Sequence, residues 1–382
     1  MVEIENLEKE KINEMYEEIA DELNISDAVF DSANKSYKAL GEYLDNNLKD
    51  YKVTIFPQGS MNLGTLIKPI NQDDDYDLDA VCKVYYEFEF PADLKNLIGD
   101  VLKESDRYSK LLVKEEGKRC WTLKYSEAAN FHMDILPSMP NNGVNNNSII
   151  ITHKEDGNYT FMVSNPEDYA TWFDKLQEKE RRVIFERNKD KFSAEVEDLR
   201  KYKIRTTLQK TIQILKRHRD IKYSNLPEEE KDKKPISIII TTLVGYMYTG
   251  EETILDLICK FVNNFQKYIE IDDNGKYIIR NPINKNENFA DKWEIYPERK
   301  DAFYSWVEGL KKDLITNNFM IFEDLVDKGN HLKKVFGTAV IESVFEKRAN
   351  AMSKKYIKTE NVATLTSDET KTEVRKHNFY GN

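Results

Sequence analysis

Asp77 and Asp79 lie two positions apart in YDLDA, a segment in which charged and apolar residues alternate. In a β-strand this spacing places both carboxylates on one face and Leu78 on the other. Two neighbouring carboxylates repel each other, and a divalent cation between them removes that repulsion. Because carboxylate oxygens favour hard cations, the pair predicts a site for Mg²⁺ or Mn²⁺.

A third acid and a glycine–serine turn extend this site. Asp134 lies in the apolar segment FHMDILP, where a buried carboxylate needs a partner or a metal. On a neighbouring strand it would complete a two-metal site that activates an attacking hydroxyl and stabilises a leaving pyrophosphate. Ser60 comes 17 residues before Asp77, and the Gly59–Ser60 turn offers close backbone approach and hydrogen-bond donors to a phosphate. An isolated DxD pair or Gly-Ser turn is common on protein surfaces, whereas this ordered set predicts phosphoryl transfer.

Two further side chains compete for a role beside these acids. Asp75 shares strand parity with Asp77 and Asp79, so it is either an outer partner of the site or, as we favour, part of a solvated acidic loop. His132 lies two residues before Asp134 on the same strand face. It is either a contact to nucleotide or, as we favour, a structural histidine.

The elements that would position these residues follow from hydrophobic periodicity. The pattern from 53 to 84 favours strands, and WTLKY and NFHMDIL favour a hairpin that turns near 127–129. Apolar residues at helical spacing predict two helices within 4–48, and Pro166 marks the start of a helical region. Further helices are expected at 204–221, which is amphipathic, and at 235–248, which is apolar.

Composition limits the class of protein. The 382 residues predict two domains or one large one. A net charge of −11 argues against a long nucleic-acid duplex as ligand. Residues 178–222 are locally basic, with 15 Lys and Arg against 8 Asp and Glu, and we interpret this stretch mainly as a solvated helix. The longest apolar run, 235–248, is too short to cross a membrane, and the acidic N-terminus does not have the pattern of a signal peptide, so a cytoplasmic protein is expected. Three scattered cysteines are expected to be reduced core residues: Cys82, Cys120 and Cys259.

The motifs together resemble the nucleotidyltransferases of the DNA polymerase β superfamily, whose pattern is hG[GS], then hDhDh, then a third hDh acid. Here the pattern reads GS at 59–60, YDLDA at 76–80 and MDI at 133–135. The longer strings QGSMNLGTLIKP, DDDYDLDAVC, FHMDILP, LQKTIQILKRHRD and PISIIITTL closely resemble the cGAS/DncV-like nucleotidyltransferases, or CD-NTases, of bacterial CBASS anti-phage systems. The resemblance covers roughly residues 50–250.

This resemblance implies an α+β fold with two lobes. The first would be a polymerase β-like nucleotidyltransferase core, a mixed sheet with helices, and the second a helical C-terminal lobe. We expect the core with its N-terminal helices at 1–165, the helical lobe at 166–352 and a flexible tail at 353–382. NTPs would bind in the cleft between the lobes.

The resemblance also implies roles for individual residues. Asp77 and Asp79 would hold both Mg²⁺ (or Mn²⁺) ions, and Asp134 would bind one of them and act as the base toward the acceptor's ribose hydroxyl. The segment Gln58, Gly59 and Ser60 would bind the donor triphosphate.

Two residues of the helical half, Lys216 and Ser237, stand where relatives place a Lys and a Ser on the donor phosphates. An ammonium and a hydroxyl at a helix start suit a polyphosphate. The alternative is that Lys216 is a surface lysine and Ser237 a helix cap. Among residues 217–219 we expect at least one structural ion pair, to Asp220 or elsewhere. Three aromatic residues are candidates either for stacking on bases or for the core: Tyr85, Tyr86 and Trp121.

The implied activity is metal-dependent synthesis of a cyclic di- or trinucleotide second messenger from NTPs, at least one of them a purine, with a separate effector that responds to the product. The terminal KHNFYGN resembles the aromatic-Gly endings of CD-NTases that conjugation machinery joins to another molecule, although Asn382 follows Gly381 here and disorder is the alternative. Three other functions remain open: synthesis of linear oligonucleotides or tailing of RNA, transfer of a nucleotide to a protein hydroxyl, and a catalytically idle nucleotide-binding scaffold.

Overall fold

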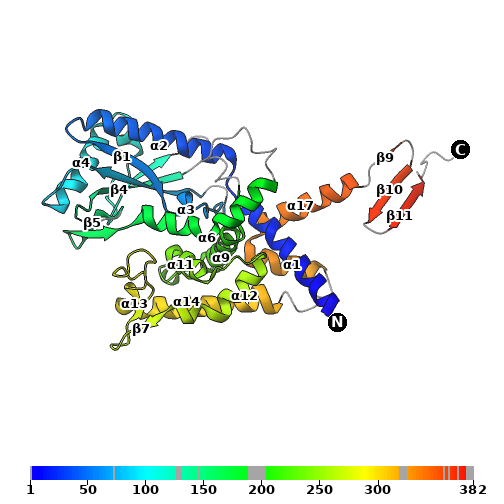
Figure 1. Ribbon diagram of the computed structural model, residues 1–382. Helices are drawn as coiled ribbons and strands as arrows, with labels where there is room; N and C mark the ends of the chain where they lie inside the picture. The colour runs from blue at the N-terminus through cyan, green and yellow to red at the C-terminus, as the bar shows by residue number, and fades with distance from the viewer. Residues whose placement is uncertain are drawn as a thin grey trace. The chain divides into compact units, whose positions relative to one another are not determined.

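The computed structural model describes residues 2–71, 74–125, 131–143, 147–187, 204–317, 325–355, 358–359, 362–367 and 370–375 (Figure 1). The chain divides into two compact units, residues 1–320 and 321–382. The first unit contains every residue that the sequence assigns to the site. Among the described residues, no helix combines the length and the apolar character that a membrane span requires.

A six-stranded mixed sheet forms the centre of the first half of this unit. Its order is β1-β2-β4-β5-β6, and β3 pairs with β4 outside this path. The pairing of β2 with β4 is parallel, and all other pairings are antiparallel. The strands are β1 (Val53–Gln58), β2 (Tyr76–Val84), β3 (Trp121–Tyr125), β4 (Phe131–Pro140), β5 (Ile149–Glu155) and β6 (Asn158–Ser164). The predicted hairpin of β3 and β4 is confirmed, and its expected turn lies outside the described residues.

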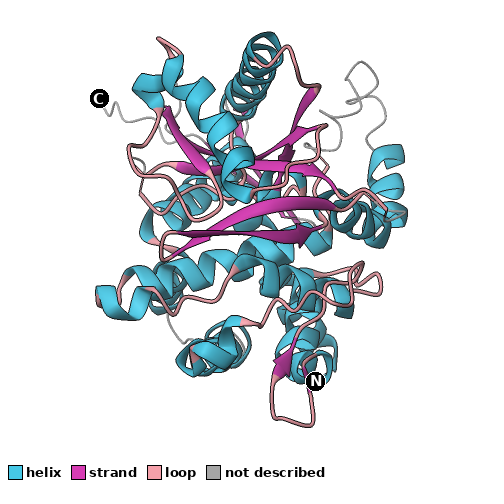
Figure 2. Cartoon of the chain, turned by 90° about the vertical axis from the view of Figure 1, so that its left-hand side faces the viewer, coloured by secondary structure: helices cyan, strands magenta, loops and turns pink. Residues whose placement is uncertain are grey.

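Helices cover both faces of this sheet (Figures 1 and 2). On one face α2 (Asp27–Asn47) and α4 (Pro91–Glu104) pack over a core that contains the inward-facing residues of β2 and β4. Leu78 is 1% exposed on that face, whereas Asp77 and Asp79 point the opposite way because side chains alternate along a strand. The two predicted N-terminal helices are confirmed as α1 (Val2–Leu23) and α2, and the Ser26 hydroxyl caps α2 by accepting a hydrogen bond from the N–H of Val29.

The helical half of the unit is built around α9 (Thr207–Ser224), which packs against α1, α11, α12 and α14. The helix predicted at 204–221 is therefore confirmed, but its amphipathic interpretation is wrong, because its polar side chains are buried as well as its apolar ones. For this helix the solvated interpretation of the basic stretch is also wrong; residues 188–203 of that stretch lie outside the described residues. The predicted apolar helix is confirmed as α11 (Ser237–Met247).

The other helices and strands of this unit are short or lie around α9. They are α3 (Gly59–Asn62), α5 (Tyr108–Leu111), α6 (Pro166–Arg187), α10 (Glu228–Lys231), α12 (Ile254–Asn264), α13 (Lys292–Ile295), α14 (Pro297–Leu310), the 3₁₀ helix η1 (Phe265–Tyr268), the π-helix η2 (Lys311–Thr316), β7 (Glu270–Ile271) and β8 (Tyr277–Ile278).

Within its described residues, the second unit contains two helices and a small antiparallel sheet. The helices are α16 (Leu325–Phe336) and α17 (Thr338–Lys355), and the sheet has the order β11-β10-β9. Its strands, β9 (Lys358–Thr359), β10 (Val362–Ser367) and β11 (Thr370–Arg375), lie within the segment predicted as a tail. The last seven residues, with the expected conjugation site at Gly381 and Asn382, lie outside the described residues, and the predicted domain limits stay predictions.

Candidate active site

The three predicted acids meet on one face of the sheet. In the parallel pairing of β2 with β4, Asp79 lies directly opposite Asp134, and Asp77 lies opposite His132. These acids line a cleft of about 940 Å³ between the sheet and the helical half. Of the eight residues that the sequence assigned to the site, seven line this cleft; the eighth, Gln58, ends β1 and pairs with Asp79 in the ladder.

Gly59 brings the Gly59–Ser60 turn, which we call the phosphate turn, against Asp79 on β2. It begins α3 with a φ of +62°, a left-handed conformation that L side chains rarely adopt. A Cβ atom built on Gly59 would lie 2.1 Å from Oδ2 of Asp79, so any other residue would force the carboxylate or the turn to move. The motif therefore requires glycine for space as well as for backbone conformation.

The electrostatics of the cleft favour a bound cation. Burial, together with the charges of Asp134 and Asp77, raises the pKa of Asp79 to about 6. Burial likewise raises the pKa of Asp77, whose carboxylate opens onto the cleft; His132 opposes this shift and Asp134 adds to it. Among the described residues, no ion pair reaches either carboxylate. Carboxylates that resist ionisation beside one another fit a divalent cation, which would stabilise their charged forms.

The carboxylates have the right chemistry for a metal but are not arranged as a closed metal site. Within the described ranges, no three His, Cys, Asp or Glu side chains already surround a common metal position. Like charges repel until a cation is present, so an open arrangement is expected of these residues. The assignment of Asp77, Asp79 and Asp134 as metal ligands stays a prediction.

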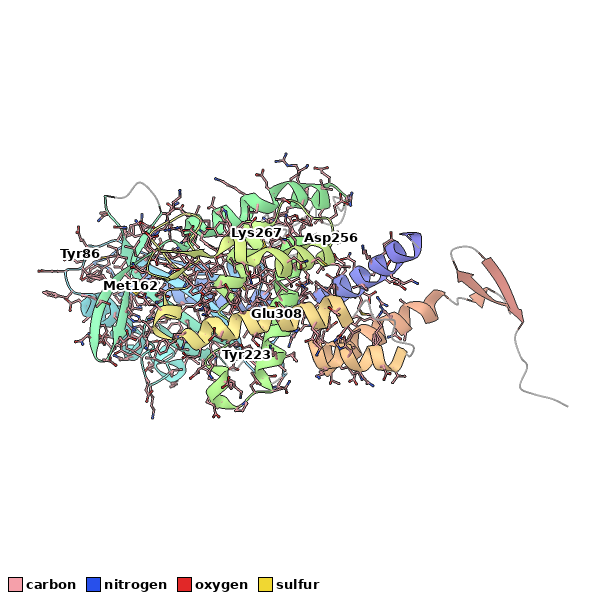
Figure 3. All side chains as sticks on the ribbon, turned by 90° about the horizontal axis from the view of Figure 1, so that it is seen from below. Tyr86, Met162, Tyr223, Asp256, Lys267 and Glu308 are labelled. Atoms are coloured by element: carbon pink, nitrogen blue, oxygen red, sulfur yellow. The ribbon has the colours of Figure 1, made fainter. Side chains whose placement is uncertain are left out.

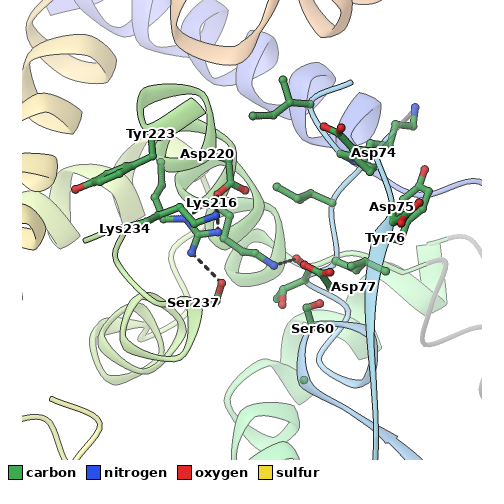
Figure 4. A pocket seen from close by; sticks show the side chains of 18 of the residues that line it. Ser60, Asp74, Asp75, Tyr76, Asp77, Lys216, Asp220, Tyr223, Lys234 and Ser237 are labelled. Atoms are coloured by element: carbon green, nitrogen blue, oxygen red, sulfur yellow. Dashed lines mark hydrogen bonds and ion pairs between the residues drawn. The ribbon is translucent and has the colours of Figure 1, made fainter. Parts of the chain in front are cut away.

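The opposite wall of the cleft supplies positive charge from α9 and the start of α11. Lys216 and Ser237 point into the cleft from this side, and Ser60 and Asp77 face them from the sheet side (Figure 4). The Lys216 side chain is 6% exposed, and its Nζ donates to the carbonyl oxygen of Thr65 at 3.0 Å, so it is not a surface lysine. Burial, together with the charge of Arg219, lowers the pKa of Lys216 to about 8.

Ser237 is the first residue of α11 rather than its cap, since Ile236 occupies the cap position. Its hydroxyl accepts a hydrogen bond from Arg219 Nη1 at 2.8 Å. Arg219 also pairs with Asp220 at 2.8 Å, which confirms the predicted ion pair in this part of the helix. Arg219 and Asp220 line the cleft as well, and the sequence analysis had assigned them only a structural role.

Comparison with known proteins agrees with this geometry. Residues 11–176 match the Second Messenger Oligonucleotide or Dinucleotide Synthetase domain. A c-di-GMP synthase of Roseivirga ehrenbergii is 26% identical over 353 residues, which cover 91% of this chain and 90% of that protein. The predicted resemblance to the CD-NTases is confirmed. The chain is a nucleotidyltransferase, and its fold is the predicted α+β fold, a mixed sheet with helices and a helical C-terminal region.

Two solved structures of CD-NTases share the fold of this chain. The Bradyrhizobium diazoefficiens CD-NTase CdnG in complex with GTP superposes with a TM-score of 0.69 at 20% identity, covering 89% of this chain and 99% of that one. Escherichia coli MS115-1 CdnC with ATP superposes with a TM-score of 0.61 at 14% identity, covering 86% of this chain and 98% of that one.

Asp75 contacts two side chains, those of His132 and Lys124, and is not part of a solvated loop. Its side chain is only 10% exposed, and its Oδ2 lies 3.0 Å from Nε2 of His132 and 3.1 Å from Nζ of Lys124. The solvated-loop interpretation of Asp75 is therefore wrong, and the structural interpretation of His132 is supported. Asp75 also lines the cleft, one strand position outside the acid pair.

The three aromatic residues considered for base stacking differ in exposure, and none of them lines the cleft. Trp121 is 4% exposed in the core, while Tyr85 and Tyr86 are 44% and 54% exposed and are not among the residues that line the cleft. Tyr86 lies at the periphery, well away from the cleft residue Tyr223 (Figure 3). The three cysteines are free, but only Cys82 is fully buried; Cys120 and Cys259 are half-buried.

Thr122 orients the third acid, and the sequence analysis missed it. It lies opposite Asp134 in the pairing of β3 with β4, and its hydroxyl donates to Oδ1 of Asp134 at 2.5 Å. The alternation of WTLKY, with Trp121 and Leu123 buried, was a signal that Thr122 faces the cleft side.

We expect Thr122→Val to lower kcat by roughly 10- to 100-fold if Asp134 is the metal ligand that the sequence predicts, because a residue that orients a metal ligand contributes on that scale. Valine keeps the shape and removes the donor, so thermal stability should change little. Thr122→Ser keeps the hydroxyl and serves as the control, which should stay near wild-type activity. Steady-state kinetics of all three proteins check this, and wild-type kcat in the valine variant would contradict it.

Proposed function

We propose that this CD-NTase transfers a nucleotidyl group from one NTP to a ribose hydroxyl of a second, and that a second transfer closes a cyclic di- or trinucleotide. In each transfer the ribose oxygen bonds to the α-phosphorus and the bond to the bridging oxygen breaks, so pyrophosphate leaves. The single observation that supports this most is the β2–β4 register, which sets Asp134 beside Asp79 at the cleft that Gly59 and Ser60 also line. CD-NTases synthesise cyclic oligonucleotide second messengers, and this chain shares the family's domain over residues 11–176.

Some residues of the cleft would stabilise charge during the reaction, and others would position the substrates. Asp77 and Asp79 would hold divalent cations, as is typical of nucleotidyltransferases of this family. When bound, these cations lower the pKa of the attacking hydroxyl and neutralise the charge of the leaving group. Asp134, oriented by Thr122, would accept the proton of the ribose hydroxyl. The Ser60 hydroxyl and the Lys216 ammonium would bind the donor triphosphate from opposite walls.

For the substrates, we propose that GTP is one of them. The Roseivirga relative carries the name of a synthase of a guanine dinucleotide, and the CdnG structure contains GTP. Linkage and ring size follow from how the linear intermediate is repositioned, and product analysis defines both.

The proposal also places the enzyme in the cytoplasm, where the cyclic product would activate a separate effector in anti-phage defence. Conjugation machinery acting on the C-terminus belongs to the same hypothesis, and mass spectrometry of the full chain from its native host would detect an added group at Asn382. No long nucleic acid and no membrane is required for this reaction.

The test is product analysis of the purified full chain. The protein is incubated with radiolabelled ATP, GTP, CTP and UTP and with Mg²⁺ or Mn²⁺, and the products are treated with phosphatase. A small phosphatase-resistant product that the Asp77→Asn, Asp79→Asn double variant does not make would support the proposal, and omission of one NTP at a time would identify the bases. Phosphatase-sensitive chains would replace it with the linear or RNA-tailing polymerase, and labelled protein with protein modification. Binding of NTPs by calorimetry without any product in either metal would support the scaffold.

A further inference from the structure

The segment that joins α3 to β2 is held to α9 through its own backbone. We call residues 63–69 the linking loop; it leads from the phosphate turn at Ser60 to the strand that carries Asp77. Side chains of α9 donate hydrogen bonds to five of its seven carbonyl oxygens. The bonds are Gln209 to Leu63 at 2.9 Å, Lys216 to Thr65 at 3.0 Å, Gln213 to Leu66 at 2.9 Å, and Arg217 to Lys68 at 2.6 Å and to Pro69 at 3.2 Å.

The donors are long polar side chains at positions 209, 213, 216 and 217, a spacing that places them on one face of α9. Gln209, Gln213 and Arg217 are 2%, 0% and 1% exposed. Polar groups buried this deeply are destabilising unless they are hydrogen-bonded, and here the partners are loop carbonyls. The loop carbonyls therefore pair with the Nε2 atoms of both glutamines and one Nη of Arg217, while among the described residues Gln213 Oε1 and Arg217 Nε are buried without a hydrogen-bond partner.

Arg217 is the strongest of these contacts. Burial lowers the pKa of its guanidinium, and among the described residues no ion pair compensates it; one Nη instead bonds to two successive carbonyl oxygens. A lysine side chain carries the same charge but ends at Nζ, one bond closer to the backbone than an arginine Nη. The position thus uses the length of arginine to place one Nη between two carbonyl oxygens at the end of the linking loop.

The loop also connects to both halves of the site. The N–H groups of Thr65 and Leu66 donate to the carbonyl oxygen of Ser60, at 2.9 and 3.1 Å. The carbonyl of Thr65 in turn accepts from Lys216, which has three donors and so keeps two for the cleft. A displaced loop would consequently move Ser60, the orientation of Lys216 and the start of β2 together.

We propose that Arg217 is a positioning residue for nucleotidyl transfer: it fixes the linking loop on α9 and thereby sets Lys216 and Ser60 relative to Asp77. The expected effect on kcat and KM rests on the proposed function, whereas the expected loosening of the linking loop does not.

The test compares full-length Arg217→Lys with wild type, and uses Arg182→Lys as a matched control. Arg182 is exposed on α6, where it pairs with Glu178 at 2.9 Å. In Arg217→Lys we expect kcat per folded protein to fall roughly 10- to 100-fold, the scale of a small misplacement of reacting groups, with a higher KM for NTP. Amide hydrogen exchange should rise at least about fivefold in peptides of residues 63–71 and stay unchanged in β5 and β6, since opening is local. The control should match wild type in every measurement.

A second perturbation acts at the other end of the loop. Gly64 has a φ of +66°, and a Cβ on it would lie 2.4 Å from Nε2 of Gln209, so Gly64→Ala should push the loop from α9 and give the same pair of effects. Gly250→Ala, also at positive φ but with nothing within 4 Å, is its control.

The outcomes separate the two proposals. Amide exchange of Arg217→Lys is measured again in the Asp77→Asn, Asp79→Asn background, where we expect no reaction. Faster exchange at residues 63–71 in that background supports the role of Arg217 in holding the loop, even if the wild type makes no cyclic product. Wild-type exchange in Arg217→Lys overturns the inference. Faster exchange with unchanged kcat and KM overturns it as well, because the loop would then be held without any effect on catalysis.

Discussion

Asparagine in place of Asp79 is expected to lower nucleotidyl transfer by roughly 10³-fold or more, because charge stabilisation by a bound cation is worth several kcal/mol and about 1.4 kcal/mol corresponds to tenfold in rate. Asp79 lies opposite Asp134 across the β2–β4 pairing and beside Asp77 on its own strand, so it is central to the acid cluster. Asparagine keeps the size of the side chain and removes one charge. Initial rates in Mg²⁺ and Mn²⁺ measure the loss, and a variant within tenfold of wild type would remove Asp79 from the metal site.

The same substitution should stabilise the metal-free protein. The pKa of Asp79 is about 6 in the folded state against 3.8 for the free side chain, so its ionisation opposes folding at high pH. This unfavourable contribution is fully present above pH 6, shrinks as the pH falls, and is absent below about 3.8, with an upper value on the order of 3 kcal/mol.

Chemical denaturation in EDTA checks this sign. Asp79→Asn should unfold at higher denaturant concentration than wild type at pH 8, and the difference should narrow as the pH falls toward 4. Asp100→Asn is the control, because Asp100 is exposed and pairs with Lys103 at 3.0 Å on the surface of α4. A less stable Asp79→Asn protein at pH 8 would contradict the prediction. A carboxylate that weakens the fold and is nevertheless present indicates a role in function rather than in stability.

Local patterns account for the part of the site that the sequence predicted correctly. The alternation in YDLDA places Asp77 and Asp79 on one face of the strand whatever surrounds it. The apolar neighbours of Asp134 indicate a strand in which a carboxylate must have a functional or structural partner. The long helices followed in the same way from periodicity. The roles of Lys216 and Ser237 came from the family resemblance, since nothing local distinguishes them from a surface lysine and a cap.

What the sequence did not predict depends on register and on distant contacts. Thr122 matters because it lies opposite Asp134, and the pairing register of β3 and β4 is not visible in WTLKY itself. Asp75 was misassigned because its partners, His132 and Lys124, come from other strands. The contact between Lys216 and Thr65 joins residues 151 positions apart, and no periodicity indicates it.

Gly59→Ala is expected to be nearly as damaging to activity as the loss of an acid, roughly 100-fold or more, since about 1 Å of misplacement at reacting groups costs that much. The added Cβ would lie 2.1 Å from Oδ2 of Asp79, and the carboxylate or the α3 turn must move to relieve it. The left-handed φ of +62° adds strain of about 1–2 kcal/mol for alanine, which lowers stability without explaining a loss of rate in the folded protein.

Gly275→Ala separates these two effects. Gly275 has a φ of +79° but nothing within 4 Å of a built Cβ, so alanine there carries the strain without the clash. Both variants should unfold at lowered temperatures, Gly59→Ala at the lower of the two because it adds the clash, while only Gly59→Ala should lose activity per folded protein. Equal activity in the two variants would mean that Gly59 serves the turn alone. A loss of activity in Gly59→Ala alone would mean that the close approach of the phosphate turn to Asp79 is itself required for catalysis. Glycine is then needed at position 59 because it is the only residue without a Cβ atom to contact that carboxylate.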